Sequence, residues 1–458
     1  MPVNLFMGVV TSKSRAWNCP NISKRAPNFY LSFSLRPLCF LPFMSGRYIF
    51  SLGCKENDLQ MTKQKQILAM KPEEISMTDK NDLKKRESEA IIQTYARQDV
   101  LLVRGSGARV WDSEGKEYLD FVAGIAVNSV GHCHPAVVEA VKRQAETLIH
   151  TSNLYYTENQ VLLAEELKAL TGMKRAYFCN SGAESVEAAM KLTRRANGRS
   201  KIVAAERAFH GRTLGALGTT YKSNYREPFR PLNEATFVPY NDTEALKFAV
   251  THETGAVILE PVQGEAGDYV ADADYLRAAR QICDDAGALL IFDEVQTGFG
   301  RTGKWFGKDH FGVMPDIITL AKAMASGLPI GAMLATGSAA EAFQMGDHGS
   351  TFAGGPLICA AALATIQVIK DEKLVQRSEE MGAYLRSQLK KLAPREIRGL
   401  GLMAGLDLDS DCKSLVEKAL QKRVLINSTG EHTIRLIPPL VVGKAEIDKV
   451  VSVIGESL

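Results

Sequence analysis

Two short apolar runs that each stop at a charged residue constrain this chain more than any other feature. ALLIF at 288–292 ends at Asp293, and IITLA at 317–321 ends at Lys322. Uninterrupted apolar runs of this length are typical of fully buried strands in parallel sheets. In an open parallel sheet the ligand crevice lies outside the carboxyl ends of the strands, so we expect Asp293 and Lys322 to face one site.

This pair of buried charges suggests a specific chemistry. Burial lowers the pKa of a lysine and leaves a nucleophilic amine that can form a Schiff base with an aldehyde. A carboxylate at the other end of an aromatic aldehyde such as pyridoxal 5'-phosphate keeps the ring nitrogen protonated and makes the ring an electron sink. Asp293 and Lys322 therefore suggest this cofactor, and a buried structural ion pair is the alternative.

The region before these runs alternates between helix and strand. The expected helices lie near 158–170, 182–196 and 275–286, and the expected strands lie at 175–179, 201–205 and 256–259. Such alternation indicates an α/β fold with a mainly parallel sheet that is covered by helices on both faces. We expect this large domain to span residues 124–356.

The two flanks have a different pattern. Residues 82–97 are helix-like, and residues 100–124 contain two or three short antiparallel strands around a turn at Ser113-Glu114-Gly115. Beyond residue 357 we expect mostly helix to 393, a strand at 397–408, a helix at 414–423 and a strand at 433–440. These flanks, 81–123 and 357–458, are expected to form the two parts of a smaller α+β domain.

Composition is that of an ordinary globular protein. The 458 residues are 45% hydrophobic and 23% charged, and a net charge of +3 gives no case for nucleic acid. The eight cysteines lack any C-x-x-C spacing, so they are interpreted as reduced thiols of an intracellular protein. His132 and His134 form a His-x-His pair without companion ligands, so we predict a structural loop before Pro135 and no metal site.

Residues 1–80 differ from the rest of the chain. Residues 1–55 carry seven Lys or Arg and no acidic residue, a composition that resembles a mitochondrial transit peptide. Prolines interrupt any long amphipathic helix there, no apolar run is long enough for a transmembrane helix, and Met61, Met70 and Met77 are all plausible starts. We interpret the segment as an extension that is disordered, mis-started or targeting.

Two further segments carry groups suited to a phosphate and to a carboxylate. Ser181, Gly182 and Ala183 lie between a strand and a helix, where free amides and a hydroxyl can bind a dianion, although a plain serine N-cap has the same pattern. Phe209 can stack on a flat cofactor, and Arg212 can bind a carboxylate with two hydrogen bonds. A core phenylalanine and a surface arginine are the alternative.

Three polar residues in loops are weaker candidates. Glu265 lies among glycines after the strand at 256–259, and Gln296 comes three residues after Asp293. Thr351 lies in the Gly-rich stretch HGSTFAGGP, which suits a phosphate contact and suits a turn equally.

Six segments, taken in order, resemble one family. The family is that of the class III, ornithine-type aminotransferases that depend on pyridoxal 5'-phosphate, and the segments are NSGAESVEAAMKLTRR, AFHGRT, LEPVQGEAG, IFDEVQTGFGRTGKWF, TLAKAMASGLPIGAM and GSTFAGGPL. The resemblance covers about residues 85–458. It implies fold type I of these transferases, with a mainly parallel central sheet, a small α+β domain built from both chain ends, and a homodimer with shared sites.

The resemblance also assigns roles. Lys322 matches the lysine that carries the cofactor and shuttles a proton, and Asp293 matches the partner of the pyridine nitrogen. The other implied cofactor contacts are Phe209 and Val295 on the two ring faces, Gln296 at the phenolic oxygen, Ser181, Gly182 and Ala183 at the phosphate, and Thr351 at the phosphate of the neighbouring subunit.

Within the class, AGIAVNSVGHCHP and TSNLYYTENQ are most similar to the acetylornithine branch. Ornithine aminotransferases have a tyrosine where Gly124 falls, and that tyrosine helps to hold a free α-amino group, so Gly124 implies space for an acylated one. Arg212 is then expected to bind the α-carboxylate of N-acetylornithine. Arg435 is expected to bind that of 2-oxoglutarate or glutamate, with Glu265 pairing with Arg435 when the other substrate is present.

The expected activity is ping-pong transfer of the distal amino group of N2-acetylornithine to 2-oxoglutarate, in arginine biosynthesis. Its products are N-acetylglutamate 5-semialdehyde and glutamate. The alternatives left open are ornithine, succinyldiaminopimelate or a lysine-pathway amine as donor, another reaction on the same fold (aminomutase, decarboxylase or racemase), and an inactive binding protein. We expect a cytoplasmic location, or the mitochondrial matrix if residues 1–80 are a transit peptide, and no membrane association.

Overall fold

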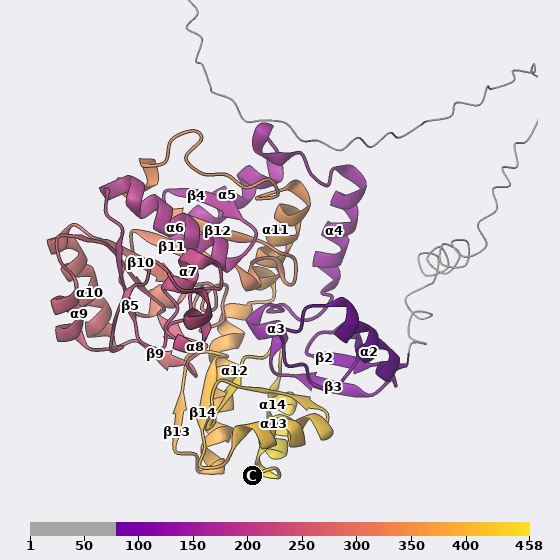
Figure 1. Ribbon diagram of the computed structural model, residues 1–458. Coiled ribbons are helices and arrows are strands. Elements are labelled where there is room, and N and C mark those ends of the chain that lie inside the picture. Colours follow the sequence, from indigo (N-terminus) through magenta and orange to yellow (C-terminus); the bar gives the residue numbers. More distant parts are fainter. Residues whose placement is uncertain (1–78) are drawn as a thin grey trace, which may run out of the picture. The chain divides into compact units, whose positions relative to one another are not determined.

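The structure is a computed structural model, and it describes residues 79–458 (Figure 1). The predicted extension at 1–80 falls outside these residues except for its last two, and its nature stays a prediction. Within the described residues, no helix combines the length and the apolar character that crossing a membrane requires.

A seven-stranded sheet forms the centre of the larger part. Its order is β4-β12-β11-β10-β7-β5-β6, and all neighbours run parallel except that β12 is antiparallel to β4 and to β11. The strands are β4 (Arg175–Cys179), β5 (Lys201–Ala205), β6 (Thr236–Val238), β7 (Thr254–Leu259), β10 (Leu289–Asp293), β11 (Ile317–Leu320) and β12 (Gly331–Ala335). All residues of β7, β11 and β12 are buried, which explains why these strands carry no charged residue and are mostly apolar.

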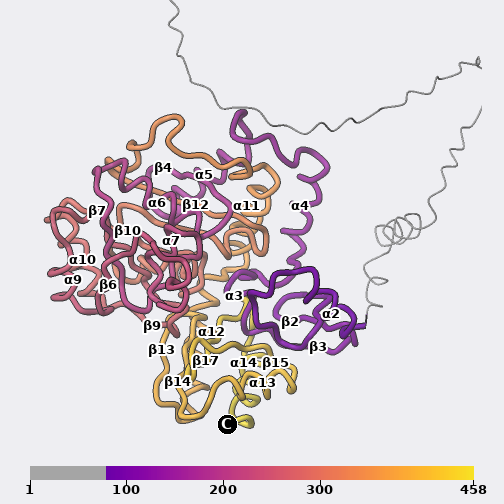
Figure 2. Tube along the Cα trace, in the orientation of Figure 1, coloured from indigo at the N-terminus to yellow at the C-terminus, as the bar shows by residue number. Residues whose placement is uncertain are grey.

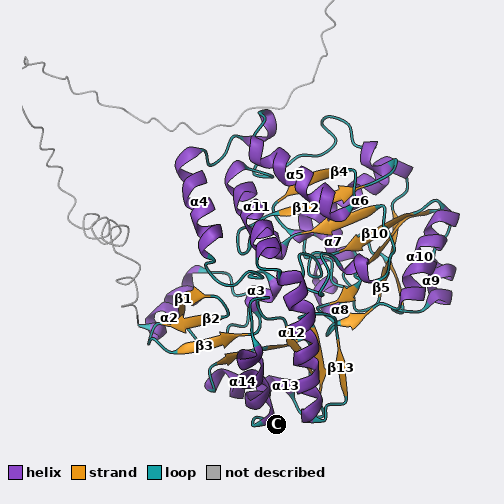
Figure 3. Ribbon diagram, turned by 180° about the vertical axis from the view of Figure 1, so that it is seen from behind, coloured by secondary structure: helices purple, strands orange, loops and turns teal. Residues whose placement is uncertain are grey.

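Helices cover both faces of this sheet (Figure 3). The helix α6 (Gly182–Asn197) packs on one face, where it contacts Ile258 of β7. Val257 and Leu259, on the other face, pack with α9 (Thr243–Ala249) and α10 (Ala273–Ala286). The remaining helices of this part are α4 (Pro135–Thr147), α5 (Glu158–Thr171), α7 (Leu214–Gly218), α8 (Ser223–Arg226) and α11 (Pro356–Asp371).

A smaller α+β part is built from both ends of the described chain. One sheet has the order β1-β2-β3-β15, in which β15 from the C-terminal end pairs parallel with β3, and a second has the order β13-β14-β17-β16. In Figure 2 the indigo N-terminal strands lie beside the yellow C-terminal segment. The predicted fold class is therefore confirmed, whereas the proposed boundaries at 123 and 356 stay predictions.

The elements of this smaller part are short. Its strands are β1 (Leu102–Ser106), β2 (Arg109–Asp112), β3 (Glu117–Asp120), β13 (Glu396–Arg398), β14 (Ala404–Asp407), β15 (Val424–Leu425), β16 (Asn427–Ser428) and β17 (Thr433–Leu436). Its helices are α2 (Lys80–Ala90), α3 (Ala123–Ala126), α12 (Leu374–Leu389), α13 (Cys412–Gln421) and α14 (Lys444–Gly455). A hairpin of β8 (Val262–Gln263) and β9 (Tyr269–Val270) follows β7.

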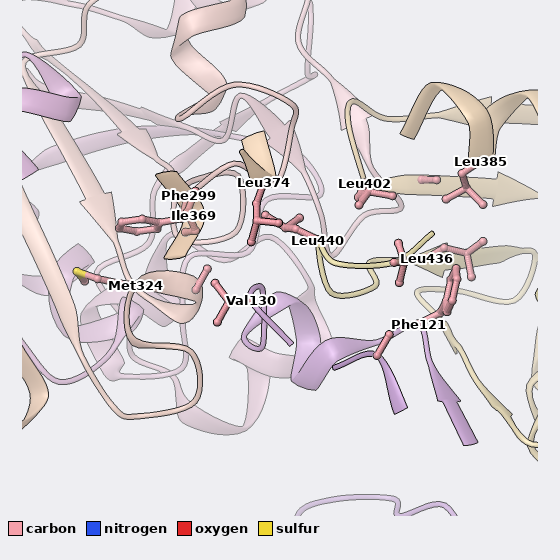
Figure 4. Packing of buried hydrophobic residues seen from close by; sticks show 14 of the residues in the cluster. Phe121, Val130, Phe299, Met324, Ile369, Leu374, Leu385, Leu402, Leu436 and Leu440 are labelled. Carbon is pink, nitrogen blue, oxygen red and sulfur yellow. The ribbon is translucent and has the colours of Figure 1, made fainter. Parts of the chain in front are cut away.

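One hydrophobic cluster joins N-terminal, central and C-terminal segments (Figure 4). Phe121, Phe299, Met324, Leu402 and Leu436 all belong to it and are at most 1% exposed. Met324 is two residues beyond Lys322, so the segment that carries this lysine is anchored in the cluster.

Two predicted elements are wrong. The helix expected over 82–97 ends at Ala90, and Ile91 is already extended. No residue of α2 is buried, so packing does not support a longer helix, and the β-branched pair Ile91-Ile92 lowers its helix propensity. The single strand expected at 397–408 is two antiparallel strands, β13 and β14. Gly399 and Gly401, with φ of 109° and 53°, turn the chain between them.

Candidate active site

The carboxyl ends of the parallel strands carry most of the predicted site residues. β10 ends at Asp293, Lys322 follows β11, and β12 begins near the same edge because it runs in the opposite direction. A cavity of about 420 Å³ opens there. It is lined by ten predicted residues, Ser181, Gly182, Ala183, Phe209, Arg212, Glu265, Asp293, Val295, Gln296 and Lys322.

Three donors hold Asp293 in one orientation. Its Oδ2 lies 2.7 Å from His210 Nδ1, and its Oδ1 accepts hydrogen bonds at 3.1 Å from Thr319 Oγ1 and the Val295 amide. Burial alone would lower the pKa of His210, but the hydrogen bond and charge of Asp293 raise it. The contact with Asp293 thus favours the protonated form of His210. His210 was not predicted, although it follows Phe209 in AFHGRT.

The backbone of Lys322 is in an uncommon conformation. This residue begins the short 3-10 helix η5 (Lys322–Ala325) with a φ of 43°, in the left-handed region that costs a non-glycine residue about 1–3 kcal/mol. Burial lowers the pKa of its amine, an effect that nearby carboxylates such as Glu265 partly oppose. A larger fraction of the amine is therefore uncharged and nucleophilic.

The N-terminus of α6 forms a wall of the cavity suited to a phosphate. Ser181 is the N-cap residue, and its Oγ accepts a hydrogen bond from the Glu184 amide at 3.2 Å. The first turn of this 16-residue helix leaves further amides free, and these attract an anion. A Cβ on Gly182 would lie 2.7 Å from Val295 Cγ1, so the backbone approaches Val295 more closely than any side chain allows.

The chemistry of these groups fits pyridoxal 5'-phosphate. The cavity offers an amine for its aldehyde, an oriented carboxylate for its ring nitrogen and free amides for its phosphate. Gln296 is 8% exposed, and its Oε1 has no hydrogen-bond partner in residues 79–458. A buried orphan amide in the wall indicates a polar ligand in the cavity.

The two predicted arginines differ in their relation to the cavity: Arg212 lines it, whereas Arg435 is not among the lining residues and pairs with Glu265, which is. Arg212 is exposed, and its guanidinium lies 3.4 Å from the centre of the Tyr225 ring and 5.7 Å from that of Phe209. Arg435 is 1% exposed, and its Nη1 donates to Glu265 Oε1 at 2.7 Å. Burial would raise the pKa of Glu265, but the charge of Arg435 lowers it, so Glu265 is held ionised.

A further carboxyl group in the cavity was not predicted. Glu260 follows β7, is 6% exposed, and accepts a hydrogen bond from the Phe209 amide at 3.0 Å. Burial raises its pKa to about 7, with Asp293 adding to the rise and His210 opposing it. Its place at the end of an apolar strand, like that of Asp293, was the available signal.

Some predicted residues lie away from the cavity. Thr351 is exposed in the loop before α11, and Gly124 is exposed, with a φ of 64°, three residues before the cavity-lining Val127. The two histidines considered for a metal contact different carboxylates. His132 Nε2 lies 2.7 Å from Asp120 Oδ2, and His134 Nε2 lies 2.9 Å from Glu372 Oε1.

Fold and site together define a pyridoxal 5'-phosphate-dependent aminotransferase. The chain belongs to the family described as Aminotransferase class-III, which matches residues 92–458. It is 56% identical over 380 residues to the acetylornithine aminotransferase of Methanosarcina acetivorans, covering 81% of this chain and 95% of the relative. It is 53% identical over 369 residues to that of Archaeoglobus fulgidus, covering 80% and 98%.

Solved structures agree with these relatives. The ornithine aminotransferase of Toxoplasma gondii superposes with a TM-score of 0.80 at 34% identity, covering 83% of this chain and 95% of that one. The acetylornithine aminotransferase of Elizabethkingia anophelis superposes with a TM-score of 0.74 at 33% identity, covering 83% and 99%.

Proposed function

We propose that this chain transfers the distal amino group of N2-acetylornithine to 2-oxoglutarate, giving N-acetylglutamate 5-semialdehyde and glutamate, a step of arginine biosynthesis. The observation that carries the proposal is a pair of arginines near one cavity: the exposed Arg212 lines it, and Arg435 pairs with Glu265, which also lines it. One carboxylate site is always available, and the second becomes available only when Glu265 leaves. The relatives named above, at 53% and 56% identity, support the same donor.

The proposed roles follow from the contacts. Bound pyridoxal 5'-phosphate supplies an electron-withdrawing ring that acidifies the carbon bearing the substrate amine. Lys322 Nζ holds the cofactor in the resting enzyme and, when free, takes up and returns the proton of that carbon. Asp293, oriented by His210, keeps the proton on the ring nitrogen. The other proposed cofactor contacts are Ser181, Gly182 and Ala183 to the phosphate, Phe209 and Val295 to the ring faces, and Gln296 to the phenolic oxygen.

Donor selection is proposed to depend on Arg212 and on the space at Gly124. Arg212 binds the α-carboxylate of N-acetylornithine, and its stacking on Tyr225 fixes the guanidinium plane for a two-bond contact. Gly124 has no side chain to occupy the region of an acylated α-amino group, and it lies on the segment that leads to Val127 in the cavity wall.

We also propose a homodimer in which Thr351 contacts the phosphate in the neighbouring subunit. The segment at 148–156 exposes large apolar side chains, with Leu154 83%, Tyr155 70% and Tyr156 102% exposed. Asn153 of this segment donates to the Ala353 carbonyl at 3.0 Å, so Thr351 and the 68% exposed Phe352 lie beside it. Exposed apolar surface of this kind indicates a protein interface.

The proposed location is the cytoplasm, with the mitochondrial matrix as the alternative if residues 1–80 act as a transit peptide.

A half-reaction titration tests the function. Purified protein with bound cofactor is mixed with N-acetylornithine, ornithine or N-succinyldiaminopimelate without any keto acid, and the visible absorption of the cofactor is followed. We expect N-acetylornithine to bleach the band at the lowest concentration and 2-oxoglutarate to restore it. A clear preference for ornithine would refute the donor, and a band that ignores every amine would refute transamination.

A further inference from the structure

A buried carboxylate, that of Asp268, lies beside Arg435, the proposed site for a dicarboxylic acid. Asp268 is 0% exposed and has a φ of 59°, in the loop that joins β8 to β9 three residues after Glu265. Neither of its carboxylate oxygens has a hydrogen-bond partner within the described part of the chain. A buried carboxylate without donors is costly in its ionised form, so this arrangement favours uptake of a proton.

Packing places Asp268 next to Arg435. Gly405 of β14 pairs directly with Arg435 of β17, and a Cβ on Gly405 would lie 3.5 Å from Asp268 Cβ. The loop is fixed against these strands, because Arg398 Nε donates to the Gly267 carbonyl at 3.0 Å and Arg435 Nη1 donates to the Gly264 carbonyl at 3.1 Å. The contact from Arg398 does not involve Arg435, so it holds the residue before Asp268 in place when the occupant of Arg435 changes.

The charged groups that act on Asp268 come from every element around it. They are Arg435 of β17, Arg398 of β13, Arg301 after β10, and Glu265 of its own loop. Arg398 is already engaged by two oxygens of Asp407 at 2.7 Å. Arg301 Nη1 donates to the Leu402 carbonyl at 3.1 Å. Arg301 and Arg435 each keep a buried Nε with no partner in residues 79–458, but of the three arginines only Arg435 pairs with Glu265, whose place a substrate carboxylate would take.

We propose that Asp268 is a specificity-determining residue that couples binding of a dicarboxylic acid at Arg435 to the uptake of one proton by its carboxyl group. The inference rests on the proposed function of Arg435. A substrate carboxylate that reaches Arg435 displaces Glu265 from it. The substrate carboxylate then lies beside Asp268, and Glu265 stays in the cavity without its partner. Protonation of Asp268 from solvent removes the repulsion between the two carboxylates.

The energetics give the direction of the pH dependence. Burial raises the pKa of Asp268 to about 7, with the charge of Arg435 opposing and that of Glu265 adding to the rise. A further negative charge at Arg435 raises this pKa again. Above about pH 7 the dicarboxylate must therefore bind together with a proton, and its apparent Kd rises by up to about tenfold per pH unit. N-acetylornithine at Arg212 leaves Glu265 on Arg435, so its binding takes no proton at Asp268.

Calorimetry with glutarate, an unreactive five-carbon dicarboxylate, tests this directly. The holoenzyme is titrated at pH 8 in two buffers of different ionisation enthalpy, and the number of protons taken up per glutarate is compared between wild type and Asp268→Asn. Asparagine tolerates a positive φ and has nearly the same shape, and Asp268→Gly serves as a second variant if the first does not fold. The matched control is Asp274→Asn, a carboxylate 94% exposed on the surface of α10.

We expect wild type and Asp274→Asn to take up more protons per glutarate than Asp268→Asn, by a difference that approaches one. From pH 7 to pH 9 the glutarate Kd should rise steeply in wild type and much less in Asp268→Asn, while the pH dependence for N-acetylornithine is the same in both. Equal proton uptake in wild type and Asp268→Asn would overturn the proposal. A wrong assignment of the function can be distinguished from a wrong role for Asp268, because in that case the cofactor absorption of wild type would not respond to N-acetylornithine.

Discussion

Replacing Gly182 by alanine tests the geometry proposed to hold the cofactor. Gly182 is the first residue of α6, and its φ is outside the left-handed region, so helix propensity alone predicts that alanine stabilises by up to about 1 kcal/mol. The added Cβ would lie 2.7 Å from Val295 Cγ1 and 3.0 Å from Cγ2, well inside the usual carbon contact of about 3.5–4.0 Å. Overpacking of this kind costs about 1–3 kcal/mol, so packing outweighs propensity.

We expect the cost to weaken cofactor binding, because Gly182 and Val295 both line the cavity and any shift that relieves the contact changes its wall. A loss of about 1–3 kcal/mol corresponds to a Kd raised by about 5- to 150-fold. The assay is titration of the cofactor-free protein with pyridoxal 5'-phosphate, read by absorption and by the melting temperature with and without cofactor. Gly349→Ala, where no atom lies within 4 Å of the new Cβ, is the control.

The double variant Gly182→Ala/Val295→Ala decides the mechanism. Removal of both Val295 Cγ atoms clears the contact, so the double variant should bind cofactor no more weakly than Val295→Ala alone. A Gly182→Ala protein that binds as tightly as wild type would refute the reasoning, as would a double variant in which the two losses simply add.

Two other predictions concern buried charges. The stabilisation from His210 and Asp293 is fully present below the ordinary histidine pKa of 6.5 and is lost as the pH rises through the raised value. His210→Leu should therefore lower the melting temperature of cofactor-free protein more at pH 6 than at pH 9, and equal losses would contradict this. Arg301→Met should lower the free energy of unfolding by about 1–3 kcal/mol in urea denaturation, because it leaves the buried Leu402 carbonyl without a donor, and a change well below about 1 kcal/mol would contradict this.

The sequence was most informative where a local pattern maps onto one edge of the sheet. Asp293 and Lys322 were found because each ends an apolar run, and parallel strands bring such ends together. Glu260 also ends an apolar strand, but the sequence gives it no role, since nothing there says that its side chain contacts the Phe209 amide. Arg435 and Glu265 are 170 residues apart, and only the family resemblance, not spacing, paired them.

The errors in the predicted helix and strand arise where the structure depends on packing and backbone conformation and not on a local sequence pattern. The end of α2 depends on what that helix can bury, and the break between β13 and β14 depends on two glycines with positive φ. The spacing of apolar residues along the sequence indicates neither. Asp268 went unnoticed for a related reason. A single aspartate in a loop is ordinarily a surface residue, and it is packing against distant segments such as Gly405 of β14 that buries this one.

The position of Lys322 combines a local cost with support from the core. Its left-handed backbone costs about 1–3 kcal/mol. The next three residues, Ala323, Met324 and Ala325, are at most 4% exposed, and burial of a methionine side chain alone contributes about 1.5–3 kcal/mol. The large hydrophobic cluster, which includes residues from both chain ends, thus holds the amine at the cavity. The orientation of the lysine is therefore supported by a cluster to which both ends of the described chain contribute.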